Sequence, residues 1–359
     1  MRHPSVELIH YLLGYALILF SLIPLIRNDN WIFRVFEYPR AQKLFINLVL
    51  LASFCVTTHV TVTHQLIFVS ALSLNLIYLS YQVWPYTFIA TKQMKKSTEA
   101  AGSRRFKLFI ANVYQDNLDT TSCIDAIRKN SPDLVLLVET DTNWKKQLDA
   151  ALKSAYKYVA GSPLNNTYGM LLYSKFELID ARVKFLVEPD VPSIHTRVKL
   201  PNGHTFRLYG LHPQPPVPQE NPRSSERDGE ILSVAKEVKG SSEPVIVAGD
   251  MNDVAWSYTT ELFLKVSKLL DPRRGRGFFN TFNAHYLFLR WPLDHVFCSV
   301  HFHLVHLERL PSIGSDHFPI LIELDLIEEK ATANQKEKLD SDAEDEKTAN
   351  RKIRKVKQS

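Results

Sequence analysis

Cysteine is scarce in this chain, and charge is missing from two long stretches. The 359 residues include three cysteines, Cys55, Cys123 and Cys298, which are scattered and form no disulfide or zinc-binding pattern. Acidic and basic residues nearly balance, with 43 Lys and Arg against 38 Asp and Glu, and 45% of the residues are hydrophobic. This composition excludes both a disulfide-rich scaffold and a disordered chain.

The uncharged stretches lie in the first quarter of the sequence. Residues 8–26 and 44–91 contain no Asp, Glu, Lys or Arg, and soluble domains rarely tolerate such runs. The second run is divided by a segment too polar for the centre of a bilayer, residues 57–65. Cleavage of the first run as a signal peptide is less favoured, because two more spans follow and no small-residue cleavage pattern is present. We therefore expect three transmembrane helices, over about residues 6–26, 43–62 and 66–89.

Basic residues are unevenly distributed around these expected spans. The loop between the second and third spans contains no Lys or Arg, and a basic linker, residues 92–105, follows the third. The loop between the first and second spans contains Arg27, Arg34, Arg40 and Lys43. By the positive-inside rule, we expect a multi-pass protein of the inner or plasma membrane whose C-terminal part is cytoplasmic.

Residues 106–327 have the pattern of one α/β domain, in which short apolar segments alternate with amphipathic ones. Strands are expected at residues 106–112, 133–139, 168–174, 194–200, 206–212, 244–249, 293–299 and 318–324, and helices at 119–129, 143–152, 224–239 and 257–269. Residues 108–327 contain 23 basic and 26 acidic residues, a net charge of −3 that argues against a broad nucleic-acid surface. Residues 328–359 are highly charged and poor in apolar residues, so we expect a disordered tail.

Polar residues gather where several of these strands end. Glu139 ends the apolar strand at 134–138, and Asp250 and Asn252 follow the strand at 244–249. Functional side chains of α/β proteins collect at such positions. Each residue alone has a simpler explanation, however, as a helix cap, a turn residue or a solvated side chain.

The combination is more specific than its parts. Gly-Asp-Met-Asn at 249–252, Pro-Leu-Asp-His-Val at 292–296 and Gly-Ser-Asp-His-Phe-Pro at 314–319 follow Asn112 and Glu139 in that order. This arrangement resembles the endonuclease/exonuclease/phosphatase superfamily over roughly residues 106–325. The resemblance implies a four-layer α/β sandwich of two mixed β-sheets flanked by helices, here preceded by the three transmembrane helices.

The resemblance also implies a site for a divalent metal ion. Glu139 matches the family's metal-ligand Glu, which binds Mg²⁺ or Mn²⁺ through hard carboxylate oxygens. Asp316 is a further candidate ligand, and Asn112 matches the Asn that positions the metal or the scissile phosphate. Family members often have Asn-Val-Asn or Asn-Val-Asp where this chain has Asn112-Val113-Tyr114, which puts a second metal in doubt.

The remaining matches concern protons and charge. Asp250 would orient or deprotonate the attacking water, and Asn252 would donate to a phosphate oxygen. His212 matches a His that stabilises charge or protonates the leaving oxygen. Asp294 would hydrogen-bond His317, fixing its tautomer and raising its basicity; whether His317 meets the phosphate as a cation or acts as a base stays open.

A Gly- and Arg-rich loop at residues 271–277 has two interpretations of equal weight. Its three arginines, Arg273, Arg274 and Arg276, could bind phosphate through planar guanidinium groups, or could simply be solvated. Arg276 is retained as a candidate contact to the substrate phosphate.

The predicted activity is metal-dependent hydrolysis of a phosphodiester or phosphate ester by water. The substrate could be a lipid head group, a nucleic acid or a small phosphodiester, and the membrane tether favours a lipid-linked one. Beyond the substrate, membrane lipids are the one partner that the spans imply. A metal-dependent nuclease acting on DNA or RNA is the alternative. A non-catalytic membrane scaffold is disfavoured, because burying the polar groups of the motifs without use would carry a desolvation cost.

Overall fold

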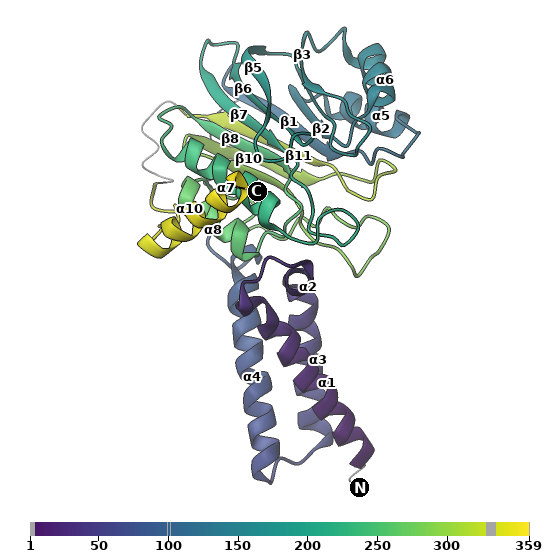
Figure 1. The fold of residues 1–359 in the computed structure, drawn as a ribbon, viewed down its shortest axis with the longest axis vertical. Helices are drawn as coiled ribbons and strands as arrows, with labels where there is room; N and C mark the ends of the chain where they lie inside the picture. Colours follow the sequence, from purple (N-terminus) through teal and green to yellow (C-terminus); the bar gives the residue numbers. More distant parts are fainter. Residues whose placement is uncertain (1–3, 99, 101, 328–334, 359) are drawn as a thin grey trace.

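The structure, a computed structural model, describes residues 4–98, 100, 102–327 and 335–358; it consists of a helical bundle joined to an α/β sandwich (Figure 1). The bundle contains α1 (Pro4–Leu22), α3 (Arg40–Thr57) and α4 (Thr63–Val83). Segments built on these helices, Ser5–Ile26, Arg40–Thr57 and Thr63–Tyr86, are each long and apolar enough to cross a membrane. Three helices are therefore present where three spans were predicted.

The ends of the second and third spans differ from the prediction. The second helix ends at Thr57, not near residue 62, where a Thr- and Val-rich segment begins; β-branched side chains lose rotamer freedom in a helix. The third helix begins at Thr63, because the Gln65 side chain accepts hydrogen bonds from the backbone N–H groups of Thr61 and Val62. This cap satisfies donors that a helix N-terminus leaves free.

Residues between α1 and α3 form a small structure of their own, which we call the junction segment (residues 27–39). It contains α2 (Trp31–Arg34) and a 3-10 turn, Val35–Glu37, and lies where the bundle meets the sandwich (Figure 1). A second 3-10 turn, Ile23–Ile26, precedes it, and a third, Trp84–Tyr86, ends α4. The turns at this end of the bundle are thus short and structured.

The sandwich has two mixed sheets with helices on both outer faces (Figure 1). The six-stranded sheet has the order β10-β11-β1-β2-β4-β3, and the five-stranded sheet the order β5-β6-β7-β8-β9. The strands are β1 (Arg105–Asn112), β2 (Leu134–Val138), β3 (Tyr158–Ser162), β4 (Met170–Ser174), β5 (Glu177–Phe185), β6 (Pro192–Lys199), β7 (Thr205–Leu211), β8 (Val245–Asp250), β9 (Asp294–Cys298), β10 (Phe302–Arg309) and β11 (Ile320–Leu326). The helices of the sandwich are α5 (Thr121–Asn130), α6 (Thr142–Leu152), α7 (Ser225–Lys239), α8 (Tyr258–Ser267) and α10 (Ala343–Lys357).

The main core lies between the two sheets. Side chains such as Leu108, Phe206 and Ile246 are fully buried there, and Phe106 stacks on Phe206 with ring centroids 4.8 Å apart. Smaller cores lie under α5 and α6 on one outer face and under α7 and α8 on the other. Strands buried on both faces read as continuous apolar runs, which is why the central strands were predictable.

The last segment of the chain corrects the expectation of a disordered tail. Residues 328–334 and 359 lie outside the described residues, but α10 packs against α7 and α8. Its Ala349 is buried in the core under those helices, and Lys352 forms ion pairs of 2.8 Å with Asp29 and Asp228. A few apolar residues on one helix face, together with partners for the charges, offset the low average hydrophobicity that predicted disorder.

Candidate active site

Strand pairing brings most of the predicted site residues to one edge of the sandwich. Asn112 ends β1 and pairs with Val138, the residue before Glu139, in the parallel β1–β2 ladder. In the other sheet Asp250 ends β8 and pairs directly with Asp294, which begins β9. The register therefore places two carboxylates of the second sheet side by side.

The backbone at two of these strand ends has unusual conformations. Gly249 has φ +135°, and a Cβ atom there would lie 2.0 Å from the carbonyl oxygen of Leu211, so no other residue fits. Glu139 and Asn252 have φ values of 61° and 49°, in the left-handed region that non-glycine residues rarely adopt. Such backbone conformations are concentrated at functional sites.

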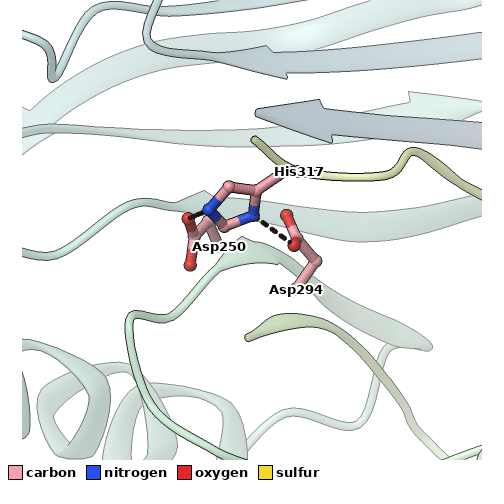
Figure 2. A group of neighbouring side chains, drawn as sticks. All are labelled: Asp250, Asp294 and His317. Carbon is pink, nitrogen blue, oxygen red and sulfur yellow. Dashed lines mark hydrogen bonds and ion pairs between the residues drawn. The ribbon is translucent and has the colours of Figure 1, made fainter. Parts of the chain in front are cut away.

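His317 bridges the two carboxylates of the second sheet, as Figure 2 shows. Its Nδ1 atom lies 2.8 Å from Asp294 Oδ2, and its Nε2 atom lies 3.5 Å from Asp250 Oδ2. His212, just after β7, approaches the same Asp250 oxygen at 3.9 Å. All four side chains are almost fully buried, so these interactions act at low dielectric.

The amide of Asn112 connects the two sheets at this edge. Its Nδ2 atom donates to Glu139 Oε1 at 2.6 Å and to Asp250 Oδ2 at 3.1 Å. The backbone N–H of Gln115 donates to the other Glu139 oxygen at 3.4 Å. Six of the predicted residues, Asn112, Glu139, His212, Asp250, Asp294 and His317, thus form one connected cluster.

The protonation states in this cluster follow from its charges. Burial would lower the pKa of His317, but Asp294 and Asp250 outweigh it and raise the pKa to about 10. Burial would raise the pKa of Asp250, but the two histidines and the N–H of Asn252 keep it below its usual value. Burial lowers the pKa of His212 to about 4, so this ring is neutral at pH 7. His317 is an imidazolium between two carboxylates.

Asn252 is oriented by residues that the sequence did not suggest. Its side chain donates to the carbonyl oxygen of Pro213 at 3.0 Å, and its backbone N–H donates to Asp250 Oδ1 at 2.9 Å. Its own carbonyl oxygen accepts from Arg227 Nη1 at 2.7 Å and from the hydroxyl of Tyr38 at 3.0 Å. Tyr38 belongs to the junction segment, so the bundle contacts the site through it; no sequence signal links positions so far apart.

Two aromatic side chains beside the histidines were also missed. The ring of Tyr168 lies 5.4 Å from that of His212, and the ring of Phe282 lies 4.9 Å from that of His317, centroid to centroid. Phe282 also forms a β-bridge with His317. Both aromatics lie in loops without a motif, which explains why periodicity did not identify them.

The arginines of the loop at residues 271–277 interact mainly with groups outside the cluster. Arg273 makes a buried ion pair with Asp271 at 2.7 Å, and Arg274 pairs with Glu261. Arg276 donates to the carbonyl oxygens of Pro272 and Met94 and contacts no member of the cluster among the described residues. The structure therefore does not bring Arg276 to the site with which it was grouped.

Asp316 lies next to His317 in the chain and is only partly buried. Its negative charge helps to raise the pKa of both His317 and Glu139. Asp253, which extends the Asp-Met-Asn motif, is fully buried; it lies 3.4 Å from Arg227 and accepts from Ser257. Asp253 is thus structural, whereas Asp316 faces the cluster.

The donor set fits a divalent cation. One group of possible ligands, Asp250, Asp294 and His317, has atoms within 4.8 Å of one another, but each His317 nitrogen already faces a carboxylate. Glu139 is the better candidate ligand, because its negative charge is disfavoured without a cation: burial, with Asp250 and Asp316 nearby, raises its pKa to about 7, although the hydrogen bond from Asn112 acts in the other direction. Four carboxylates share one imidazolium here, and a hard cation would compensate that excess of negative charge.

Comparison with known proteins gives the family. A family model described as the endonuclease/exonuclease/phosphatase family matches residues 110–317. The chain belongs to this family. Enzymes of the family hydrolyse phosphate esters and generally depend on divalent metals, and the sheets of the sandwich have the arrangement of its solved members. No curated protein matches the sequence.

Several solved structures share the fold. An endonuclease/exonuclease/phosphatase from Beutenbergia cavernae is 17% identical, with a TM-score of 0.51, over 62% of this chain and 72% of that chain. A family protein from Bacteroides thetaiotaomicron is 19% identical, with a TM-score of 0.50, over 63% of this chain and 96% of that chain. The human Nocturnin catalytic domain with bound sulfate is 14% identical, with a TM-score of 0.50, over 63% and 96%. Identities this low establish the fold alone.

Proposed function

We propose that this protein is a membrane-anchored, divalent-metal-dependent phosphoesterase that hydrolyses a phosphodiester or phosphate ester. The observation that carries the proposal is the buried Asp294–His317–Asp250 arrangement (Figure 2), which is joined to Glu139 through Asn112. It combines a carboxylate that can accept a proton, an imidazolium that can stabilise negative charge and a carboxylate suited to a metal.

Glu139 would hold Mg²⁺ or Mn²⁺, with Asn112 and Asp316 as further ligands. When bound, the ion would polarise a phosphate oxygen and stabilise the charge that develops on it. Asn112 also positions the Glu139 carboxylate, to which it donates at 2.6 Å. The ligands therefore lie beside the residues that handle protons.

Side chains of the protein would activate the water, stabilise the charge on the phosphate and contact the substrate. Asp250, kept ionised by its neighbours, orients the attacking water and accepts its proton. His317 donates a hydrogen bond to a phosphate oxygen from Nε2, which lies 3.5 Å from Asp250, while Asp294 on Nδ1 keeps the ring oriented and protonated. His212 is neutral, and its buried Nδ1 atom has no hydrogen-bond partner among the described residues, which leaves that atom for substrate. Asn252 contributes an amide donor on the same side.

The position of the bundle supports a substrate at the membrane surface. Tyr38 of the junction segment contacts the carbonyl of Asn252, and Tyr86, at the end of α4, donates to the carbonyl of Ala255 at 2.6 Å. The edge of the sandwich that holds the candidate site, which we call the catalytic edge, is therefore in contact with the ends of the expected spans. The Lys and Arg residues of the loop between the first two expected spans, Arg27, Arg34, Arg40 and Lys43, lie at this same end, so the domain would be cytoplasmic. A reporter fused to the C-terminus should score cytoplasmic, and an external signal would reverse the orientation.

Hydrolysis by the full-length protein in detergent micelles tests the activity. The assay compares single-stranded DNA, duplex DNA, RNA, a phospholipid panel and an aryl phosphodiester, with Mg²⁺ or Mn²⁺ and with chelator. We expect metal-dependent turnover of phospholipid or aryl phosphodiester that is lost in His317→Ala. Turnover of nucleic acid alone would favour a nuclease. If no substrate is hydrolysed although the metal still binds, a non-catalytic scaffold would be favoured.

A further inference from the structure

A surface groove of about 550 Å³ lies beside the active site, on the side of the helical bundle. We call it the arginine groove; the residues that line it include Phe88, Arg276, Leu287, Phe288, Arg290 and Arg309. Arg290 and Arg309 both lie over the ring of Phe318, at 4.9 and 4.2 Å from its centroid. Because Phe318 follows His317 directly, the groove is adjacent to the catalytic edge yet separate from it.

The arginine groove carries more positive than negative charge, with three arginines and one glutamate in its lining. Each of the three guanidinium groups donates to backbone carbonyl oxygens: Arg276 to Pro272 and Met94, Arg290 to Tyr286 and Ala284, and Arg309 to Asn280. Among the residues that the structure describes, no carboxylate lies within 4.0 Å of any of them. Glu308 also lines the groove, but its carboxylate lies 3.1 Å from the ring of His306.

These guanidinium groups are also partly withdrawn from water. Burial lowers the pKa of Arg276, and burial together with the charge of Arg290 lowers that of Arg309. Arginine pairs well with phosphate because its planar fork donates two parallel hydrogen bonds. A bound phosphate would supply the negative charge that the groove lacks.

The rim of the arginine groove is apolar and exposed. Phe88, Leu287 and Phe288 have relative exposures of 81%, 68% and 80%, values that isolated surface residues reach but a clustered set rarely does in a water-soluble protein. The Phe88 ring lies against Gly277, where a Cβ atom would approach it to 3.0 Å. Side chains of this kind are suited to the interface between lipid head groups and acyl chains.

The groove is continuous with the expected membrane spans. Gln42, in the first turn of α3, donates to the carbonyl oxygens of Phe288 and Arg290 at 3.1 and 3.5 Å. Phe88 follows the turn that ends α4. The apolar rim therefore lies at the level where the helical bundle enters the domain.

We propose that the arginine groove binds one anionic phospholipid of the surrounding bilayer, with its phosphate on Arg290 and Arg309, assisted by Arg276, and an acyl chain along Phe88, Leu287 and Phe288. The proposal rests on the proposed membrane insertion of the bundle but not on the proposed hydrolysis. The bound lipid would hold the catalytic edge against the membrane surface.

Native mass spectrometry of the full-length protein in maltoside micelles tests this. With dioleoyl phosphatidylglycerol we expect one preferentially bound lipid, at least about tenfold tighter than dioleoyl phosphatidylcholine. The double variant Arg290→Gln/Arg309→Gln should lose this preference. The matched control is Arg128→Gln, whose exposed side chain on α5 lies far from the bundle (Figure 1) and which should bind as the wild type does.

Two further arms keep the test decisive. Phe288→Ser removes an exposed ring whose loss leaves no cavity, and it should weaken phosphatidylglycerol binding several-fold with an unchanged melting temperature. Inorganic phosphate should not displace the lipid at millimolar concentration; full displacement would reduce the groove to a free-anion site and overturn the proposal, as would unaltered lipid preference in the double variant. His317→Ala should bind lipid normally, so failure of hydrolysis and failure of this site are distinguishable.

Discussion

Two buried clusters of carboxylates in this molecule are balanced in opposite ways. Where the junction segment meets α7 and α10, Asp228 and Asp29 are surrounded by cations: Arg34 lies 3.3 Å from Asp228, and Lys352 lies 2.8 Å from both. At the catalytic edge, Glu139, Asp250 and Asp294 share a single imidazolium, that of His317. The carboxylates of the first cluster are balanced by cations of the chain, whereas those of the second outnumber the one cation beside them.

This difference in charge balance distinguishes a cluster that stabilises the fold from a candidate active site, without reference to any motif. Compensated carboxylates have lowered pKa values, as for Asp29, where burial is outweighed by Lys352 and Lys355 and the pKa is about 2. The uncompensated Glu139 has a pKa raised to about 7 by its burial. A protein retains such an imbalance at a cost in stability, which fits a site that acts on metal and phosphate.

The largest effect should come from the uncompensated cluster. Asp250→Ala removes the proposed proton acceptor, and we expect turnover of the aryl phosphodiester to fall by at least about 10⁴-fold, or ~5.5 kcal/mol in activation free energy. Turnover is measured with saturating Mn²⁺, and thermal melting verifies the fold. Near-normal turnover in a folded variant would defeat the assignment.

The compensated cluster should respond in stability instead. Asp228→Ala leaves Arg34, Arg227 and Lys352 short of a buried partner, and breaking such a network costs about 3–5 kcal/mol of unfolding free energy. Denaturant unfolding measures the loss. The control, Glu177→Ala, breaks an exposed ion pair with Lys199 and should cost under about 1 kcal/mol. Equal losses in the two variants would mean that the ion pairs of the junction stabilise the fold no more than a surface ion pair does.

The two clusters also differ in how far the sequence predicted them. The candidate catalytic residues lie in short motifs at the ends of buried apolar strands, so their order along the chain was informative. The ion pairs of the junction join residues up to 323 positions apart, as between Asp29 and Lys352, and no local pattern encodes such a pairing. Arg276 shows the converse. It belongs to a loop whose sequence resembles a phosphate-binding motif, but in the fold it lies outside the cluster.

The strands that were missed share one physical feature. β3, β5 and β10 are all edge strands, and their side chains alternate irregularly between exposed and partly buried positions. An edge strand can pair on one side only and needs no continuous apolar run, so hydrophobic periodicity identifies it poorly. The central strands were predicted because both of their faces are covered, and so was the edge strand β9, whose residues are all buried.

Metal binding should distinguish the two clusters through an effect of intermediate size on the free energy of unfolding. Mn²⁺ at about 100 times its Kd should raise the unfolding free energy by ~2.7 kcal/mol in the wild type. Glu139→Gln should lose most of this gain, whereas Asp228→Ala, though less stable, should keep it. Differential scanning calorimetry with and without Mn²⁺ measures the shifts; an equal gain in Glu139→Gln would exclude Glu139 as a ligand.

Acid should weaken the compensated cluster over a defined range of pH. The pKa of Asp29 is lowered from its ordinary value of about 4 to about 2, so its stabilising contribution is present above pH 4 and is lost as the pH falls through 2. Asp29→Asn should therefore lower the melting temperature at pH 6, and the difference from wild type should vanish near pH 2. A constant difference across that range would show that the Asp29 charge contributes nothing.

The smallest effect should appear where the two regions touch. Tyr38→Phe removes one of two donors to the carbonyl of Asn252, and Arg227 Nη1 remains at 2.7 Å, so we expect a stability loss of only ~1 kcal/mol. If the bundle helps to orient Asn252, kcat should also fall, by about two- to fivefold, with KM nearly unchanged. Tyr81→Phe, an exposed tyrosine on α4, should leave both quantities unaltered. A stability loss without any change in kcat would mean that the junction supports the domain but does not act on its chemistry.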